Sequence, residues 1–227
     1  MGTRAETYAA ILHTVYGALM ANLLLVVGCL PLVVGVIVTD PARSWPLLAL
    51  LAPGCTPALV GVFAVLASLG DRPSDAGVLR TFGRAWRASW RRATGLGALA
   101  VGAVVVLGVD TRWAWGRQIG ALVIPVLAVL IVLVLATALL ALVVLAERPG
   151  VRLRDAVRAC GYLAVRRWYL TLVSLTVLGL LVQLVALRPA LALGLAAAPL
   201  LYLVWANSRY TLRPALDPPL PIGAVAA

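Results

Sequence analysis

Residues 79–93 read LRTFGRAWRASWRRA, which places five arginines and two tryptophans in one short stretch. The chain is almost purely apolar on both sides of it, with TPALVGVFAVLASLG at 56–70 and GLGALAVGAVVVLGV at 95–109. Apolar runs of about 20 residues have the length of a helix that crosses a bilayer. The stretch therefore predicts a charged loop between two membrane-crossing helices.

The composition of the whole chain points the same way. It is 63% hydrophobic and only 12% charged, whereas a soluble domain is about 25% charged. We expect an all-α, polytopic transmembrane helical bundle of about six spans, with one transmembrane domain over 1–207 and a short cytoplasmic tail over 208–227. The six apolar segments are 10–38, 45–69, 95–109, 119–146, 169–187 and 190–206.

The arginines are distributed unevenly along the chain. All 19 basic residues are arginine, and the formal net charge is +11. With the N-terminus inside, 15 of them fall in inner segments, and only Arg43, Arg112, Arg117 and Arg188 fall in outer loops. This asymmetry fits the positive-inside rule. We expect a multi-pass protein of the bacterial cell membrane with both termini cytoplasmic; the use of arginine without lysine suggests a GC-rich bacterial genome.

The loop at 79–93 has the pattern of an amphipathic helix. At about 100° per residue, its aromatic and arginine side chains fall on different faces. We expect it to lie at the cytoplasmic interface, with arginines toward lipid phosphates and aromatics toward acyl chains. Ordinary inside-positive charges in a flexible loop are the alternative. The predicted interface and partner-binding residues here are Arg80, Arg84, Trp86, Arg87, Trp90 and Arg91.

A second inner loop, ERPGVRLRDAVRACGYLAVRRW from Glu147, has the same amphipathic pattern. Arg154 and Arg158 lie opposite its apolar face, which predicts a second cytoplasmic amphipathic helix and extends the predicted interface to these two residues. DRP at 71–73 corresponds to ERP at 147–149, and the offset stays near 75 residues. The sequence thus suggests a parallel repeat that relates 57–109 to 132–187.

Three blocks resemble the YesL-like family of bacterial membrane proteins: NLLLVVGCLP (22–31), TPALVGVFAV (56–65) and VLRTFGRAWRASWRRA (78–93). The resemblance covers about residues 8–95. Between the first two blocks this chain has the longer insert LPLVVGVIVTDPARSWPLLALLAPGC, with no threonine in the Leu-Pro block. The family's function is largely unknown. The resemblance implies an accessory role beside carbohydrate ABC transporters.

No catalytic constellation is present in the sequence. His13 is the single histidine, and Cys29, Cys55 and Cys160 have no metal-like spacing. No carboxylate lies inside an apolar segment, which argues against an ion-coupled transporter. We expect neither enzymatic activity nor a cofactor, a bound metal or a nucleic-acid partner.

Asn22 and Gln183 are polar residues within the apolar runs. Such residues either bond a neighbouring helix or line a polar cavity. We predict that Asn22 is buried against another helix and that Pro31 bends the chain beyond it.

Two functions follow as hypotheses. The first is a non-enzymatic membrane accessory or scaffold protein, whose partners are anionic inner-leaflet lipids and an ABC-type sugar importer. The alternative is a small-molecule transporter or channel with a polar mid-membrane cavity at Asn22 and Gln183.

Overall fold

The computed structural model describes residues 2–40, 43–70, 77–118, 120–148, 150–188 and 191–216, and within these ranges the side chains of residues 15–212. These ranges contain helices and no strand, so the predicted all-α fold is confirmed. The elements are α1 (Gly2–Gly28), α2 (Leu30–Val38), α3 (Trp45–Leu51), the 3-10 turn η1 (Ala52–Cys55), α4 (Thr56–Gly70), α5 (Val78–Ala114), α6 (Gly120–Glu147), α7 (Leu153–Arg166), α8 (Trp168–Leu187), the π-helical turn η2 (Ala192–Ala196) and α10 (Ala197–Leu216).

Helix α4 forms the centre of the core. Val60, Phe63 and Val65 of α4 are completely buried, because α4 contacts α1, α5, α6 and α10 around its circumference. A helix that is apolar all round, as α4 is in the sequence, can be buried on every side. The other helices are therefore organised around the block TPALVGVFAV.

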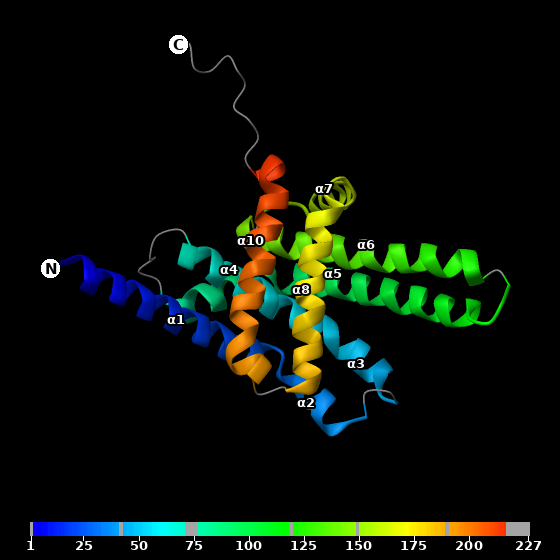
Figure 1. Ribbon diagram of the computed structural model, residues 1–227, viewed down its shortest axis with the longest axis horizontal. Coiled ribbons are helices and arrows are strands. Elements are labelled where there is room, and N and C mark those ends of the chain that lie inside the picture. The colour runs from blue at the N-terminus through cyan, green and yellow to red at the C-terminus, as the bar shows by residue number, and fades with distance from the viewer. Residues whose placement is uncertain are drawn as a thin grey trace, which may run out of the picture.

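Two helix pairs are arranged across one another (Figure 1). Helices α5 and α6 form a long hairpin, and α8 and α10 form a second pair that runs across it. The end of α4 and the start of α5 lie at the left of the view, and helix α7 and the end of α10 lie at its top. The α2–α3 region and the end of α8 lie in its lower part, and the tip of the hairpin lies at its right.

The first apolar segment is broken, as Pro31 predicts. Helix α1 ends at Gly28, α2 begins at Leu30, and the two axes differ by 67°. The bend lies at Cys29, before the proline, because Pro31 occupies the first turn of α2, where its missing N–H costs no hydrogen bond. The expected bend is thus confirmed and is located two residues before the proline.

The second apolar segment is also irregular. The η1 turn interrupts it between α3 and α4, with Pro53 inside the turn. The Thr56 hydroxyl lies 2.7 Å from the Pro53 carbonyl and 2.8 Å from the Ala93 carbonyl of α5. One hydroxyl therefore caps the irregular turn and links it to the neighbouring helix.

Four helical stretches are long and apolar enough to cross a membrane: Trp45–Leu69, Val78–Ala114, Gly120–Glu147 and Trp168–Leu187. The bent pair of Val15–Gly28 and Leu30–Val38 makes a fifth if it counts as one span. The predicted sixth span, 190–206, is not confirmed, because η2 and α10 do not meet the same criteria within the described residues. Helix α10 continues to Leu216, past the point where we expected the tail to begin.

Candidate functional site

The arginine stretch forms the first half of α5. We expected a separate interfacial helix, but α5 runs unbroken for 37 residues from Val78 to Ala114 and contains the whole segment 95–109. No proline interrupts it, and the glycines at 95 and 97 do not stop a helix that is packed along its length. The short third apolar segment therefore gains its length from the charged stretch.

The apolar face of this half of α5 contacts protein. Phe82 is buried, and its ring lies against Gly61 of α4 so closely that a Cβ atom at Gly61 would be 2.7 Å from it. Trp86 is half-buried, and its ring packs edge-on against Trp90 with 4.7 Å between the centroids. Trp90 keeps 43% of its surface exposed. The predicted contact of these aromatics with acyl chains therefore applies mainly to Trp90.

The arginine face is solvent-exposed. Arg80, Arg84, Arg87 and Arg91 are all exposed. No ion pair involves any of them in the part of the chain that the structure describes. Their guanidinium groups therefore present unneutralised positive charge on a helix that the core holds in place.

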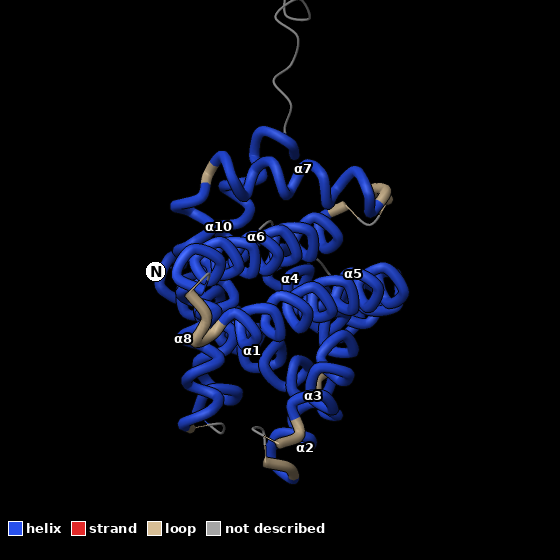
Figure 2. The backbone as a smooth tube through the Cα atoms, turned by 90° about the vertical axis from the view of Figure 1, so that its right-hand side faces the viewer, coloured by secondary structure: helices blue, strands red, loops and turns tan. Residues whose placement is uncertain are grey.

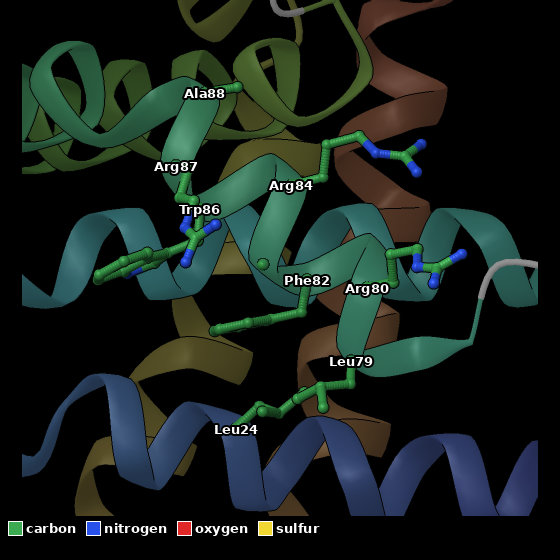
Figure 3. Close-up of a pocket in the computed structure, with 9 residues that line it drawn as sticks. Leu24, Leu79, Arg80, Phe82, Arg84, Trp86, Arg87 and Ala88 are labelled. Atoms are coloured by element: carbon green, nitrogen blue, oxygen red, sulfur yellow. The ribbon is translucent and has the colours of Figure 1, made fainter.

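A hollow of about 850 Å³ combines the two faces (Figure 3). Arg80 and Arg84 extend to one side of α5, Phe82 extends to the other, and Leu24 of α1 lies below. Its lining is cationic at one edge and apolar at the other. The lining residues are Leu24, Leu79, Arg80, Phe82, Gly83, Arg84, Trp86, Arg87 and Ala88.

The second amphipathic segment is a separate helix, α7, as predicted. Arg154 and Arg158 are exposed, and the opposite face buries Ala156, Cys160 and Leu163 mainly against α6. Burial raises the pKa of the Cys160 thiol to about 12, so this cysteine is a neutral packing residue. The structure does not show a ligand-binding role for it.

The two arginine-bearing helices are directly linked. The Nη1 atom of Arg92 in α5 donates a hydrogen bond of 3.5 Å to the carbonyl of Val151, just before α7. At this length the bond is weak, but it shows that the segments are adjacent. In the view of Figure 2, α7 lies above α6 and α5, away from α2 and α3. The arginine-bearing part of α5 is thus adjacent to the segment that leads into α7.

Asn22 is 3% exposed and contacts another helical element, as predicted. Its Nδ2 atom donates a 3.0 Å hydrogen bond to the Gly194 carbonyl in η2. A π-helical turn displaces the regular bonding pattern and makes such carbonyls available. Its Oδ1 atom has no partner among the described residues.

The structure does not bring Asn22 and Gln183 together. Gln183 is exposed on α8, whereas Asn22 lies beside a groove of about 610 Å³ between α1, α4 and α10. The other lining residues are apolar apart from the Tyr202 hydroxyl. The expected polar cavity shared by these two residues is therefore not found in the described part of the chain.

Sequence reasoning missed a polar cluster where α6, α8 and α10 meet. Asn207 donates to the Leu170 carbonyl and the Ser174 hydroxyl, and Arg167 donates a 3.0 Å bond to the Tyr210 carbonyl. Arg209 pairs with Glu147 at 3.5 Å. The run ANSRY at 206–210 was a usable signal, because it places adjacent polar residues at the end of an apolar segment.

A family model described as "Protein of unknown function, DUF624", a domain that YesL-like proteins carry, matches residues 18–111. The chain is therefore similar to this family from α1 to the tip of the α5–α6 hairpin, which is less than half of its length. No curated protein and no solved structure matches.

The described residues contain no group of three or more histidine, cysteine or acidic side chains that could hold a metal ion. The His13 side chain lies outside the described part. What the site offers is an exposed cationic face and an apolar hollow beneath it, which suits binding to anions and amphiphiles.

Proposed function

We propose that this protein is a non-enzymatic accessory or scaffold protein of the bacterial cell membrane, with both termini cytoplasmic. The proposal rests on the arginine asymmetry together with the exposed arginines of α5 and α7. The Arg92–Val151 contact is the observation that carries it. It places the arginine-bearing part of α5 next to the segment that leads into α7.

The exposed arginines of α5 and α7 suit two kinds of partner. Each arginine near an anionic leaflet contributes about 1 kcal/mol to binding before screening by salt. Exposed guanidinium groups also form bidentate bonds with carboxylates of a protein partner. The resemblance to YesL-like proteins favours a component of an ABC-type sugar importer as that partner.

A photo-crosslinking experiment in native membranes tests the proposal. A benzophenone amino acid replaces Ala159, an exposed residue of α7 between the arginines. The control position is Ala121, which is exposed near the tip of the hairpin, away from α7. We expect a discrete protein adduct at Ala159 only, which mass spectrometry identifies as a membrane transport component. Equal adducts at both positions, or lipid adducts alone, would overturn the proposal.

The transporter or channel alternative has one observation in its favour, the unpaired Oδ1 atom of Asn22 beside the groove between α1, α4 and α10. An apolar wall suits a hydrophobic molecule better than a sugar. Uptake of a labelled sugar by proteoliposomes that contain only this protein, abolished by Asn22→Leu, would favour the alternative over the scaffold.

A further inference from the structure

A second hollow lies next to the arginine pocket on α5. It has a volume of about 690 Å³, and its walls come from the α1–α2 break, the η1 turn and α5. Val27, Pro31 and Leu51 contribute apolar surface. Phe82 and Trp86 line both this groove and the arginine pocket. A ligand that passes these two rings would touch cationic groups at one end and apolar groups at the other.

We propose that this composite site binds one anionic phospholipid, with its phosphate at Arg80 and Arg84 and one acyl chain in the groove. The inference deepens the proposed function, since it rests on the membrane setting of α5. It differs from general attraction to an anionic leaflet, because it assigns one lipid to a defined position on the protein.

The charge of the pocket selects the headgroup. Arg80 and Arg84, which have no ion-pair partner in the described part, extend to the same side of the pocket, whereas Arg87 lies on the other side beside Trp86 (Figure 3). Guanidinium binds phosphate oxygens through paired hydrogen bonds, which makes arginine a preferred phosphate ligand. A net anionic headgroup is therefore favoured over a zwitterionic one, whose ammonium the arginines would repel.

The apolar lining and the volume of the groove favour a ligand with an acyl chain. Its volume lies within the roughly 300–1,000 Å³ of ligand pockets, and the broken helices give it an open side. An acidic peptide or free phosphate would satisfy the arginines and leave this apolar surface uncovered. A lipid satisfies both parts at once.

An unpaired polar group marks the junction between the two parts. The Nε1 atom of Trp86 has no acceptor among the described residues, and neither does the Thr94 hydroxyl further along the groove. In a phospholipid, ester carbonyls lie between phosphate and tail. The Nε1 atom is itself buried, so an ester carbonyl at the level of Trp86 would accept the indole hydrogen once the ring turns toward the pocket.

Native mass spectrometry of the full-length protein in mild detergent tests the site. The protein is delipidated and titrated with dioleoyl phosphatidylglycerol, dioleoyl phosphatidylcholine or inorganic phosphate. We expect one tightly retained phosphatidylglycerol and at least about tenfold weaker retention of phosphatidylcholine. Equal retention of the two lipids would overturn the proposal, as would complete displacement of phosphatidylglycerol by millimolar inorganic phosphate.

Three variants and one matched control locate the lipid. Arg80→Gln/Arg84→Gln should weaken phosphatidylglycerol binding about tenfold or more, and Arg112→Gln/Arg117→Gln at the far tip should leave it unchanged. Gly54→Leu fills the groove, since a Cβ atom there meets nothing within 4 Å. It should weaken the dioleoyl lipid but not the dihexanoyl lipid. Trp86→Phe should weaken both lipids about threefold.

The outcomes separate this site from the proposed function. Unchanged binding in the arginine variant overturns the lipid site, even if the Ala159 photoadduct persists and the scaffold role stands. Specific lipid binding without any protein adduct supports the lipid site and overturns the scaffold role. If Gly54→Leu does not elute as the native protein does, the arginine variants and the comparison of lipids decide alone.

Discussion

The Thr56 hydroxyl lies 2.8 Å from the carbonyl of Ala93, at the point where α4 begins and the charged half of α5 ends. Gly97, one turn further along α5, faces the same threonine, and a Cβ atom there would lie 2.6 Å from the Thr56 methyl group. The two helices therefore approach through small side chains, as membrane helices do when packing and interhelical hydrogen bonds drive their association.

Thr56→Val removes this hydrogen bond and keeps the side-chain shape. We expect a loss of about 1 kcal/mol in stability, because the side-chain hydrogen bond between α4 and α5 is lost while the Ala93 carbonyl keeps its bond within the helix. Thr56→Ser keeps the hydroxyl and should lose less. Thermal unfolding in mild detergent compares them, and an equal Tm for valine and wild type would show that the bond is not needed.

Gly61→Ala should destabilise the protein by about 1–3 kcal/mol, because the new methyl group displaces the Phe82 ring. Phe82→Leu in the same chain should recover part of this loss. Gly102→Ala is the matched control, since its Cβ atom meets nothing within 4 Å, and it should stabilise by about 0.5–1 kcal/mol. Additive effects of Gly61→Ala and Phe82→Leu would contradict the contact.

Asn22→Leu should lower stability by about 0.6–2 kcal/mol, because it removes the only side-chain hydrogen bond that the structure gives between α1 and η2 within the described residues. Gln183→Leu is the control, and it should change Tm little because Gln183 is exposed on α8. A larger loss from Gln183→Leu than from Asn22→Leu would reverse this assignment.

The thiols of Cys29 and Cys55 lie close to each other, at the break between α1 and α2 and at the end of η1. Mild oxidation with copper phenanthroline should therefore join them, with loss of two alkylatable thiols per chain. Cys160 is the internal control. Because burial raises its pKa to about 12, it carries little thiolate at neutral pH and should react slowly with maleimide until the solution approaches that pH. A disulfide that includes Cys160 would contradict the packing.

The arginine distribution predicts that both termini are cytoplasmic, which requires η2 and α10 to cross the membrane in addition to the five candidate spans. Reporter fusions after Leu69 and after Ala227 should both be active in the cytoplasm, and a fusion after Gly116 at the hairpin tip should be active outside. An outside signal at either of the first two positions would reject the orientation.

Part of this fold could be predicted because local chemistry dictates it. Pro31 removes a backbone donor and favours a break, although Pro125 lies inside the unbroken α6, and Asn22 requires a polar partner in hydrocarbon. The identity of that partner could not be predicted, because the Gly194 carbonyl becomes available only when η2 adopts a π-helical turn. The sequence thus predicts that a buried polar residue has a hydrogen-bond partner more readily than it predicts which group that partner is.

The continuity of α5 escaped prediction for a related reason. A change from arginine-rich to apolar sequence near residue 94 looks like a boundary between elements, but composition alone does not break a helix. In the second half of the proposed repeat the chain does break between the charged and the apolar segment, at Arg167 between α7 and α8, although the sequence pattern is similar. Tertiary contacts, such as the bond from Arg167 to the Tyr210 carbonyl, distinguish the two.

Helix α5 is a single continuous rod that joins the arginine stretch to the tip of the α5–α6 hairpin. Its 37 residues span roughly 55 Å at about 1.5 Å per residue. Trp113 stands at one end of this rod and the arginines at the other. Because α5 has no break between these two ends, a tilt of the arginine end would also move Trp113. Helices α7 and α8 are separated at Arg167, so a movement of α7 need not be transmitted to α8. The two halves of the proposed repeat thus differ, because one has a continuous helix where the other has two.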